Sequence, residues 1–361
     1  MFRLFKKKPE NFNGRVLGGA VIGYGGMGHY HAKQMNQLPY LKFIGAYDID
    51  PKKNEEAASK GVKAYKNPEE LFADPEVDFV VIATPNEVHA PYAIAAANAG
   101  KHIVVEKPVT MNAGLLEDMI AAAEKNNVKL MVHQNRRWDG DYMTAKNIYD
   151  TQVIGKIYYI ESRISGSNGI AEDWRSVRMY GGGMLYDWGI HMIDQVMMMV
   201  KSKLIGVYCN LSYVQKYDAD DGFSLILYFE DGTRAMLDFD TNDFTGTKRW
   251  RLFGEEGTAA FNWASMGTMI KVVDKKDSNI RPVQIGNGMT KTIAPRSRFS
   301  QRKVKIEKKH GGWDSFYNQY YSYVVNNGEP AIKTCENLRV MKVIDACFLS
   351  HEKQQRITVD I

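Results

Sequence analysis

The feature that most constrains the fold of this chain is a strict alternation of short apolar runs with helical segments between Val16 and Gln134. Parallel strands covered by helices on both faces read as continuous apolar runs. Such runs are GGAVIG, FIGAY, FVVIAT, HIVVEK and VKLMVHQ, and helical segments separate them. Because strand and helix follow each other in turn, this part of the chain is expected to form a doubly wound parallel sheet.

The helical segments carry start signals. Asp50 and Asn67 each stand before a proline, so that a side-chain cap is followed by a residue whose φ already suits a helix. Helices are also expected at residues 29–38, 88–99 and 115–124.

The loop GYGGMG joins the first strand to the first helix and has the spacing of a dinucleotide-binding fingerprint. Gly23 permits the tight turn, Gly25 lets the backbone approach a pyrophosphate, and Gly28 lets the helix pack on the strand. Free N–H groups and the positive dipole at the start of the helix favour phosphate. An ordinary glycine-rich turn is the alternative, but the strand-turn-helix context favours a dinucleotide.

Asp48 ends the second strand, about 20 residues past Gly28, where the fingerprint requires an acid. Its carboxylate can accept hydrogen bonds from both hydroxyls of the adenosine ribose and would repel a 2′-phosphate, so NAD is favoured over NADP. Lys52 and Lys53 stand nearby and could partly accommodate that phosphate. The alternative for Asp48 is a helix cap or a solvent-facing acid.

Three further segments leave the carboxyl ends of predicted strands, which is the edge where open α/β sheets bind ligands. They are ATPNEVH (83–89), VVEKPV (104–109) and HQNRRW (133–138). The expected cofactor contacts are Gly23, Gly25, Gly26, Met27, Gly28, Asp48, Thr84, Asn86, His89, Glu106, Lys107 and Gln134. Lys107 precedes a proline at a rigid strand end and points into the predicted cleft; the alternative is a surface lysine that extends into solvent.

After about residue 150 the pattern changes to longer alternating runs, which predict a mostly antiparallel open sheet. Asp231-Gly232 and Glu256-Gly257 stand where hairpin turns belong. Helices are expected at about 184–199, 313–327 and 335–352. The predicted units are an N-terminal tail (1–14), a dinucleotide-binding domain (15–138), a second α/β domain (139–334), and a C-terminal helix and tail (335–361) that pack back on the first domain.

GGGMLYDWGIHMID (181–194) is the second strong signal. On an α-helix, Asp187, His191 and Asp194 would share one face, because they are four and seven residues apart. An imidazole between two carboxylates has the composition of an oriented general acid or base. The alternative is a buried histidine that Asp187 merely satisfies.

In this order, the GxGxxG loop, the Glu106-Lys107-Pro108 tripeptide and the GGGxLxDxGxHxxD pattern resemble the glucose-fructose oxidoreductase and inositol dehydrogenase family, Gfo/Idh/MocA. HGGWD at 310–314 adds a weaker match. The segment WRSVRMYGGG departs from the family's WRxDPxxxGGG. The resemblance implies a Rossmann domain, a C-terminal domain that mediates homo-oligomerisation, and NAD(P)-dependent oxidation of sugar or cyclitol hydroxyls.

The family's catalytic triad corresponds to Lys107, Asp187 and His191, with Asp194 at a position that often touches substrate. We therefore expect hydride transfer from a secondary alcohol, with His191 as base, Lys107 stabilising the oxyanion and Asp187 orienting the imidazole. Lys107 and His191 could exchange roles. The expected substrate contacts are Lys107, Arg136, Trp174, Asp187, His191, Asp194 and His310.

Aromatic side chains in or near the predicted cleft segments could cover the apolar face of a sugar; they are Trp138, Trp174, Tyr180, Tyr186 and Trp313. The first expectation for substrate is a glycoside with a bulky aglycone, oxidised at a ring alcohol such as C3, followed by inositols and free sugars. Three alternatives stay open: an NAD-dependent glycosidase, a non-catalytic nucleotide-binding regulator, and a dehydrogenase that retains its nicotinamide between two sugars.

Charge and composition restrict the partners and the cellular location that we expect for this chain. The net charge of +5, from 47 basic and 42 acidic residues, is mild and spread along the chain, so we expect no nucleic-acid partner. The basic stretch 296–309 reads as a solvated strand or loop, or alternatively as an oligomer arm or cleft lid. Three widely spaced cysteines, no secretory signal and no long apolar run predict a cytoplasmic protein without a membrane span. No cluster demands a metal.

Overall fold

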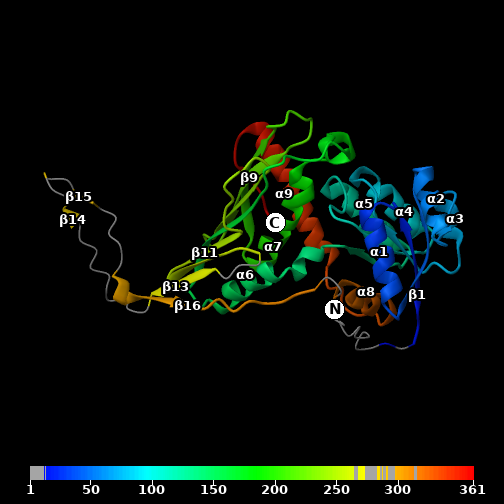
Figure 1. Cartoon of the computed structure of the whole chain (residues 1–361), viewed down its shortest axis with the longest axis horizontal. Coiled ribbons are helices and arrows are strands. Elements are labelled where there is room, and N and C mark those ends of the chain that lie inside the picture. Colours follow the sequence, from blue (N-terminus) through cyan, green and yellow to red (C-terminus); the bar gives the residue numbers. More distant parts are fainter. Residues whose placement is uncertain are drawn as a thin grey trace.

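The computed structural model describes residues 12, 14–263, 267–272, 283–284, 287, 290–291, 297–312 and 315–361. Two large sheets organise this part of the chain, one carrying the first half of the sequence and the other most of the second (Figure 1). The fold class expected from the sequence is confirmed: a doubly wound parallel sheet is joined to an α/β unit with a mostly antiparallel sheet.

The first sheet has six strands in the order β3-β2-β1-β4-β5-β6, and every neighbouring pair is parallel. The strands are β1 (Leu17–Ile22), β2 (Leu41–Tyr47), β3 (Lys63–Ala64), β4 (Phe79–Ile82), β5 (His102–Val105) and β6 (Leu130–Val132). The chain reverses its direction of travel across the sheet between β1 and β4. Such a switch point opens a crevice at the carboxyl ends of the strands.

Helices connect these strands: α1 (Gly26–Gln37), α2 (Pro51–Ser59), α3 (Pro68–Ala73), α4 (His89–Asn98) and α5 (Ala113–Lys125). The predicted caps are confirmed, because the Asp50 side chain accepts from the Lys52 N–H and Asn67 from the Glu70 N–H. The first helix begins at Gly26, three residues before the predicted start at His29. The end of the glycine loop therefore forms the first helical turn.

The second sheet has nine strands in the order β16-β13-β12-β11-β7-β10-β9-β8-β17. They are β7 (Ile157–Ser165), β8 (Leu204–Ser212), β9 (Gly222–Phe229), β10 (Arg234–Asp240), β11 (Trp250–Gly254), β12 (Gly257–Phe261), β13 (Thr268–Val272), β16 (Gln301–Val304) and β17 (Ile357–Thr358). Among these, β7 and β10 form the one parallel pair. The predicted hairpins are present between β9 and β10 and between β11 and β12. β14 (Val283–Gln284) and β15 (Thr290–Lys291) pair separately.

Further helices are α6 (Gly140–Thr151), α7 (Ile190–Met199), α8 (Ser315–Val325) and α9 (Thr334–Lys353). Sequence reasoning did not predict α6. Short 3₁₀ turns are η1 (Asn86–Val88), η2 (Asn135–Trp138), η3 (Trp174–Ser176), η4 (Arg178–Tyr180) and η6 (Arg298–Ser300). The regular helix expected from 184 is corrected, because η5 (Leu185–Gly189) is a π-helical turn that precedes α7.

The last two helices tie the halves of the chain together. In the first half of the chain, α9 packs against strand β6 and helix α5. In the second half, it packs against helix α7 and strand β8 (Figure 1). α8 falls in the range assigned to the second domain, yet its rings pack on the first: Tyr320 contacts Phe79 and Tyr321 contacts Tyr40. The boundaries between the four predicted units stay predictions.

Buried apolar side chains of both sheets form one continuous cluster. No helix within the described ranges has the length and apolar character that a membrane span needs. Some expectations lie outside the described residues, namely those on most of the N-terminal tail, on Arg296, and on Trp313 and Asp314.

Candidate functional site

A cavity of about 680 Å³ opens at the switch point of the first sheet. It is lined by residues from the carboxyl ends of β1, β2, β4 and β5, with Trp174, Arg175 and Asp187 from the second half of the chain. Of the predicted cofactor residues, those that line it are Gly23, Gly25, Gly26, Met27, Asp48, Thr84, Asn86, Glu106 and Lys107. The structure therefore brings the glycine loop together with two of the three segments that sequence reasoning placed at one sheet edge, 83–89 and 104–109, whereas no residue of 133–138 lines this cavity.

The glycine loop forms the floor of this cavity where α1 begins. A Cβ on Gly28 would lie 2.1 Å from the backbone oxygen of Gly23, so only glycine lets the helix approach its own loop this closely. A Cβ on Gly25 or Gly26 would meet no atom of the described residues within 4 Å, so both glycines border open space. The first turn of α1 has no side-chain cap from the described part of the chain. Its N–H groups are suited to a pyrophosphate, so the residues present fit a dinucleotide.

Asp48 lies at the far end of the cavity and is held by backbone donors. Its Oδ2 accepts from the Tyr24 N–H at 2.6 Å and its Oδ1 from the Asp50 N–H at 2.9 Å. Each oxygen keeps a second acceptor position for a ribose hydroxyl. Lys53 pairs with Glu56 at 3.2 Å, which occupies one of the two lysines that could accommodate a 2′-phosphate.

Lys107 and Asp187 form an ion pair that joins the two halves of the chain. The Lys107 Nζ donates to the Asp187 Oδ1 at 2.6 Å and to the Asp187 backbone oxygen at 2.9 Å. The Arg175 Nε lies 3.7 Å from the Asp187 Oδ2. Burial raises the pKa of Asp187, but the charges of Lys107, Arg175 and Arg136 outweigh it, so the net pKa is lowered. The carboxylate is therefore ionised at neutral pH.

The triple glycine and the π turn place Asp187 at this position. Gly183 has a φ of +106°, and a Cβ there would lie 2.1 Å from the Asp220 Oδ1. Asp220 in turn accepts from the Leu185 N–H at 2.8 Å, at the start of η5. A π turn is wider than an α turn and changes the angle between successive side chains. Asp187 therefore leaves the face on which α-helical spacing would put it.

His191 lies in α7, is only 4% exposed, and its Nδ1 has no hydrogen-bond partner in the described part of the chain. Burial and the charges of Lys107 and Arg136 hold the pKa of His191 well below its ordinary value. The imidazole is therefore neutral and can accept a proton. The expectation that Asp187 orients this ring is corrected, because the Asp187 carboxylate is directed at Lys107.

The structure also departs from the expectation that Asp194 contacts substrate. Its carboxylate receives two hydrogen bonds from Arg137, at 2.9 and 2.6 Å, and Arg137 also binds Glu336 of α9 at 2.6 Å. Arg137 and Asp194 are largely buried, whereas the Glu336 side chain is 23% exposed, and none of the three lines the cavity. Sequence reasoning missed Arg137, because the adjacent Arg136 has the same local signal.

Arg136 does not line the dinucleotide cavity, but its charge reaches the site. Its guanidinium lies 4.2 Å from the Trp188 ring and forms a 3.0 Å ion pair with Asp139. The same positive charge lowers the pKa of both His191 and Asp187.

Three predicted cofactor residues do not line the cavity: Gly28, His89 and Gln134. His89 is fully buried, and its two ring nitrogens lie 2.9 Å from the Pro108 oxygen and 3.0 Å from the Thr84 oxygen. It bridges two cavity segments from behind. Gln134 is buried, and its Oε1 has no partner among the described residues.

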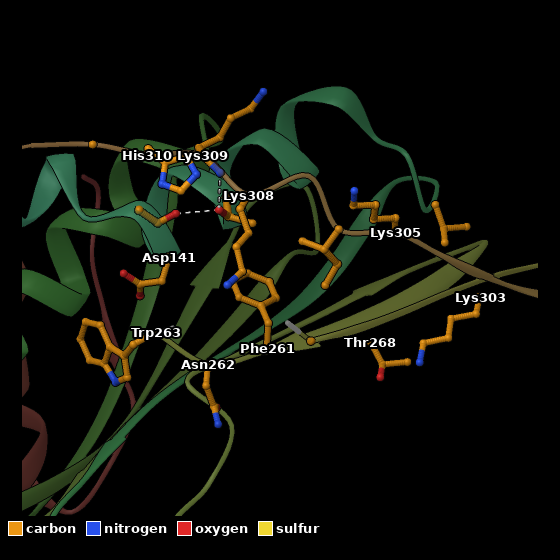
Figure 2. A pocket seen from close by; sticks show the side chains of 16 residues that line it. Asp141, Phe261, Asn262, Trp263, Thr268, Lys303, Lys305, Lys308, Lys309 and His310 are labelled. Atoms are coloured by element: carbon orange, nitrogen blue, oxygen red, sulfur yellow. Dashed lines mark hydrogen bonds between the residues drawn. The ribbon is translucent and has the colours of Figure 1, made fainter. Parts of the chain in front are cut away.

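His310 lines a different pocket from the dinucleotide cavity. That pocket, of about 720 Å³, is lined by the start of α6, the end of β12 and residues 303–311. Figure 2 shows His310 and Lys309 on one wall, with Asp141, Phe261 and Trp263 below them. The expectation that His310 lies near the substrate stays a prediction.

A smaller cavity of about 300 Å³ shares Arg175 and Asp187 with the dinucleotide cavity. Its aromatic wall consists of Trp188 and Phe239, whose rings stack at 5.7 Å. Of the aromatic residues proposed from the sequence, Trp174 lines the dinucleotide cavity, whereas the Tyr186 hydroxyl donates to the Met111 oxygen. Sequence reasoning missed Trp188 as a cavity residue, and the signal that could have identified it is its place beside Asp187.

Sequence reasoning also missed a buried cluster behind the cavity. His31, Glu106 and His133 place ligand-type atoms within 4.8 Å of one another, and no comparable group occurs elsewhere among the described residues. Each histidine lies 2.8 Å from the Glu106 Oε1, which is a direct hydrogen-bond distance. The expectation that the reaction needs no metal stays a prediction.

Comparison with known proteins gives two family matches. Residues 17–134 match the model of the GFO/IDH/MocA oxidoreductase family, NAD-binding Rossmann fold, and residues 142–260 match the GFO/IDH/MocA C-terminal domain. The two ranges cover the first sheet, strands β7 to β11 of the second sheet and the turn that carries Asp187.

Individual proteins agree with these matches. The crystal structure of an NAD-binding protein from Listeria innocua has a TM-score of 0.90 and 38% identity, and the alignment covers 96% of this chain and 100% of that one. The myo-inositol 2-dehydrogenase of Thermotoga maritima is 29% identical over 245 residues, 66% of this chain and 72% of that protein. A gentamicin A biosynthesis protein solved with NAD shares the fold, with a TM-score of 0.74 and 21% identity over 96% of this chain and 97% of that one.

Proposed function

The chain belongs to the GFO/IDH/MocA family of NAD-binding oxidoreductases, and from this premise we propose that it oxidises a secondary hydroxyl of a sugar, a glycoside or a cyclitol to a ketone. It is an NAD-dependent dehydrogenase acting on CH–OH groups. The observation that carries the proposal is the pairing of Lys107 with Asp187 on the wall of the dinucleotide cavity. His191 does not line this cavity, but it is neutral and near enough for the Lys107 charge to lower its pKa.

The proposed reaction moves one hydride and one proton. Bound NAD supplies the hydride acceptor for the C–H bond of the alcohol carbon. The imidazole of His191 takes the hydroxyl proton, which its lowered pKa permits because the ring is neutral beforehand. The electron pair of the broken O–H bond then forms the carbonyl.

Lys107 stabilises the negative charge that develops on the substrate oxygen. Its ammonium is held by the Asp187 carboxylate at 2.6 Å, so the charge is already in place before the reaction. Asp187 thus orients Lys107, where the sequence suggested that it orients His191. This arrangement favours His191 as the base and Lys107 as the group that stabilises the oxyanion, rather than the reverse.

The neighbouring 300 Å³ cavity supports a substrate larger than a free sugar. It adjoins the reacting residues through Arg175 and Asp187, and its wall of Trp188 and Phe239 offers aromatic faces to an aglycone. A glycoside oxidised at a ring alcohol such as C3 is therefore the first candidate. The inositol dehydrogenases among the relatives support cyclitols as the second.

The substrate class is tested by following NADH absorbance with a panel of cyclitols, hexoses, and O- and C-glycosides, with NMR to locate the oxidised carbon. We expect NADH production with at least one member and a ketone at a former secondary alcohol. Release of an aglycone without net NADH would support the glycosidase alternative, and no turnover with any member would contradict the proposed substrate class.

Substitution of the reacting residues tests the mechanism. His191→Ala and Lys107→Ala should each lower kcat by about 10²–10⁴-fold, which is the usual contribution of a positioned acid or base. NAD binding, measured by calorimetry, should persist in His191→Ala. A turnover number of the wild-type order in either variant would show that the role assigned to that residue is wrong.

The remaining expectations concern the setting of the enzyme. We propose that the chain assembles as a homo-oligomer through its nine-stranded sheet and acts in the cytoplasm. Support for a reducing compartment comes from the three cysteines, all of which are free. Light scattering of the purified protein tests the assembly.

A further inference from the structure

A buried polar network lies directly behind the dinucleotide cavity and has no part in the mechanism above. It consists of His31 from α1, Glu106 after β5, His133 after β6 and Tyr317 from α8. His31, His133 and Tyr317 are at most 1% exposed, and Glu106 is 6% exposed. Groups this polar are seldom buried unless hydrogen bonds satisfy them.

A single assignment of donors and acceptors accounts for all hydrogen bonds of the network. Burial holds the pKa of Tyr317 well above its ordinary value, so its hydroxyl stays protonated and donates to the His31 Nδ1 at 2.6 Å. Burial also lowers the pKa of His31, so the ring is neutral and its Nε2–H donates to the Glu106 Oε1 at 2.8 Å. His133 donates to the same oxygen from Nδ1, at 2.8 Å.

The network leaves a net negative charge on Glu106. The Nε2 of His133 is buried without a partner among the described residues, and protonating it would create an unpaired buried donor. One N–H on each imidazole is enough to make all the hydrogen bonds described for the two rings. Two imidazole N–H groups at 2.8 Å from the Glu106 Oε1 stabilise the carboxylate form of this buried residue.

The position of Glu106 determines what its charge can act on. The residue lines the dinucleotide cavity, and its Oε2 accepts from the backbone N–H of Lys107 at 3.2 Å. Lys107 marks the reacting end of the cavity, because it is the residue paired with Asp187; Asp48 marks the ribose end. The reacting ring of NAD is cationic in the oxidised form and neutral in the reduced form.

We propose that His31, His133 and Tyr317 are positioning residues that hold Glu106 as a fixed negative charge at the reacting end of the cavity, where it favours NAD⁺ over NADH. This charge is buried, so solvent screens it far less than a surface carboxylate. An enzyme with this preference releases NADH more readily after oxidising its substrate. The inference rests on NAD binding and not on the identity of the alcohol.

The test measures the dissociation constants of NAD⁺ and NADH for the full-length enzyme by calorimetry, without any alcohol. Glu106→Gln keeps the shape of the side chain and removes its charge. We expect the ratio Kd(NAD⁺)/Kd(NADH) to rise about tenfold, because only the cationic form loses an attraction. Equal weakening of both forms would overturn the inference and leave Glu106 a structural residue.

A matched pair of variants tests the positioning role. His133→Leu removes a donor to Glu106, whereas His133→Asn can place an amide N–H near the position of Nδ1. The ratio should rise in the leucine variant and return toward the wild-type value in the asparagine variant. The same ratio in all three proteins would overturn the role of His133.

These outcomes are separable from the proposed function. If Glu106→Gln does not fold, the His133 pair decides alone, with melting curves to verify folding. Failure of the substrate panel leaves the binding ratios intact, and unchanged ratios leave the proposed oxidation of an alcohol intact.

Discussion

At the scale of single residues, the charges around the cleft determine which groups can exchange a proton. Burial and the charges of Lys107 and Arg136 lower the pKa of His191 and keep it neutral. Asp187 stays ionised because it faces Lys107 and Arg175. The sequence identified Lys107, Asp187 and His191 as a set. It did not reveal that Asp187 contacts Lys107, because a contact between residues 80 positions apart leaves no local pattern.

Asp48 gives a test of cofactor choice at this scale. Asp48→Ser removes the carboxylate that is placed to bind the ribose hydroxyls and to repel a 2′-phosphate. Loss of charge-assisted hydrogen bonds worth about 1.5–3 kcal/mol should weaken kcat/KM for NAD by about 10–100-fold. Activity with NADP should rise.

Steady-state kinetics with both cofactors and a substrate from the panel measure this change. Lys52→Ala serves as control, because that exposed lysine leaves the carboxylate in place. An unchanged preference for NAD in Asp48→Ser would mean that another group selects the cofactor.

At the scale of elements, most helices and strands of the first sheet follow from capping residues and apolar runs, as at Asp50 and Asn67. The π turn at Leu185–Gly189 does not, because its residues also suit an α-helix. Its geometry depends on Gly183 and on Asp220, which receives the Leu185 N–H. A partner 35 residues away along the chain therefore determines which way Asp187 points.

Helix α8 provides a matched pair for an element-scale prediction. Tyr317 and Tyr320 are both buried on this helix, but only the Tyr317 hydroxyl has a described partner, the His31 of α1. Tyr317→Phe should destabilise the protein by about 1–3 kcal/mol, because the His31 Nδ1 loses its donor in a buried site.

Tyr320→Phe removes a hydroxyl that has no partner among the described residues and should change stability little or increase it. Urea unfolding of the two variants gives the comparison. Equal destabilisation by both would mean that the loss of the hydroxyl itself, and not of the α8–α1 hydrogen bond, determines the effect.

At the scale of the whole molecule, the site exists only where the two halves meet. The ion pair of Lys107 with Asp187 crosses this junction, and so does the 2.7 Å hydrogen bond from the Asn86 side chain to the Gly181 oxygen. α9 packs on both halves and reinforces their arrangement. The dinucleotide cavity and the smaller aromatic cavity therefore share a wall at this junction.

The buried Asp220 makes global stability depend on pH. Burial raises its pKa to about 7, far above the ordinary value of 3.8 for an exposed aspartate. Between these two values the folded protein holds a proton that the unfolded chain has lost, so raising the pH favours unfolding. The stabilising contribution is complete below about pH 4 and is lost as the pH rises through about 7.

Asp220→Asn should remove this pH dependence of the free energy of unfolding. The Asp220 contribution to that free energy is a few kcal/mol at most. Melting temperatures from pH 5 to pH 8 provide the measurement. Relative to wild type, the variant should gain stability as the pH rises, and parallel curves would show that Asp220 does not titrate in this range.

The sequence by itself determined the class of the fold, most strands and helices of the first half, the glycine loop and most of the predicted cofactor residues that line the dinucleotide cavity. These properties depend on interactions within one or two turns of the chain, or on patterns that burial imposes on each strand. The tertiary structure alone decided that Asp187 faces Lys107, that Arg137 donates hydrogen bonds to Asp194, and that His310 lies in a separate pocket. Those pairings join residues far apart along the chain, and they depend on how the two sheets and the π turn pack in space.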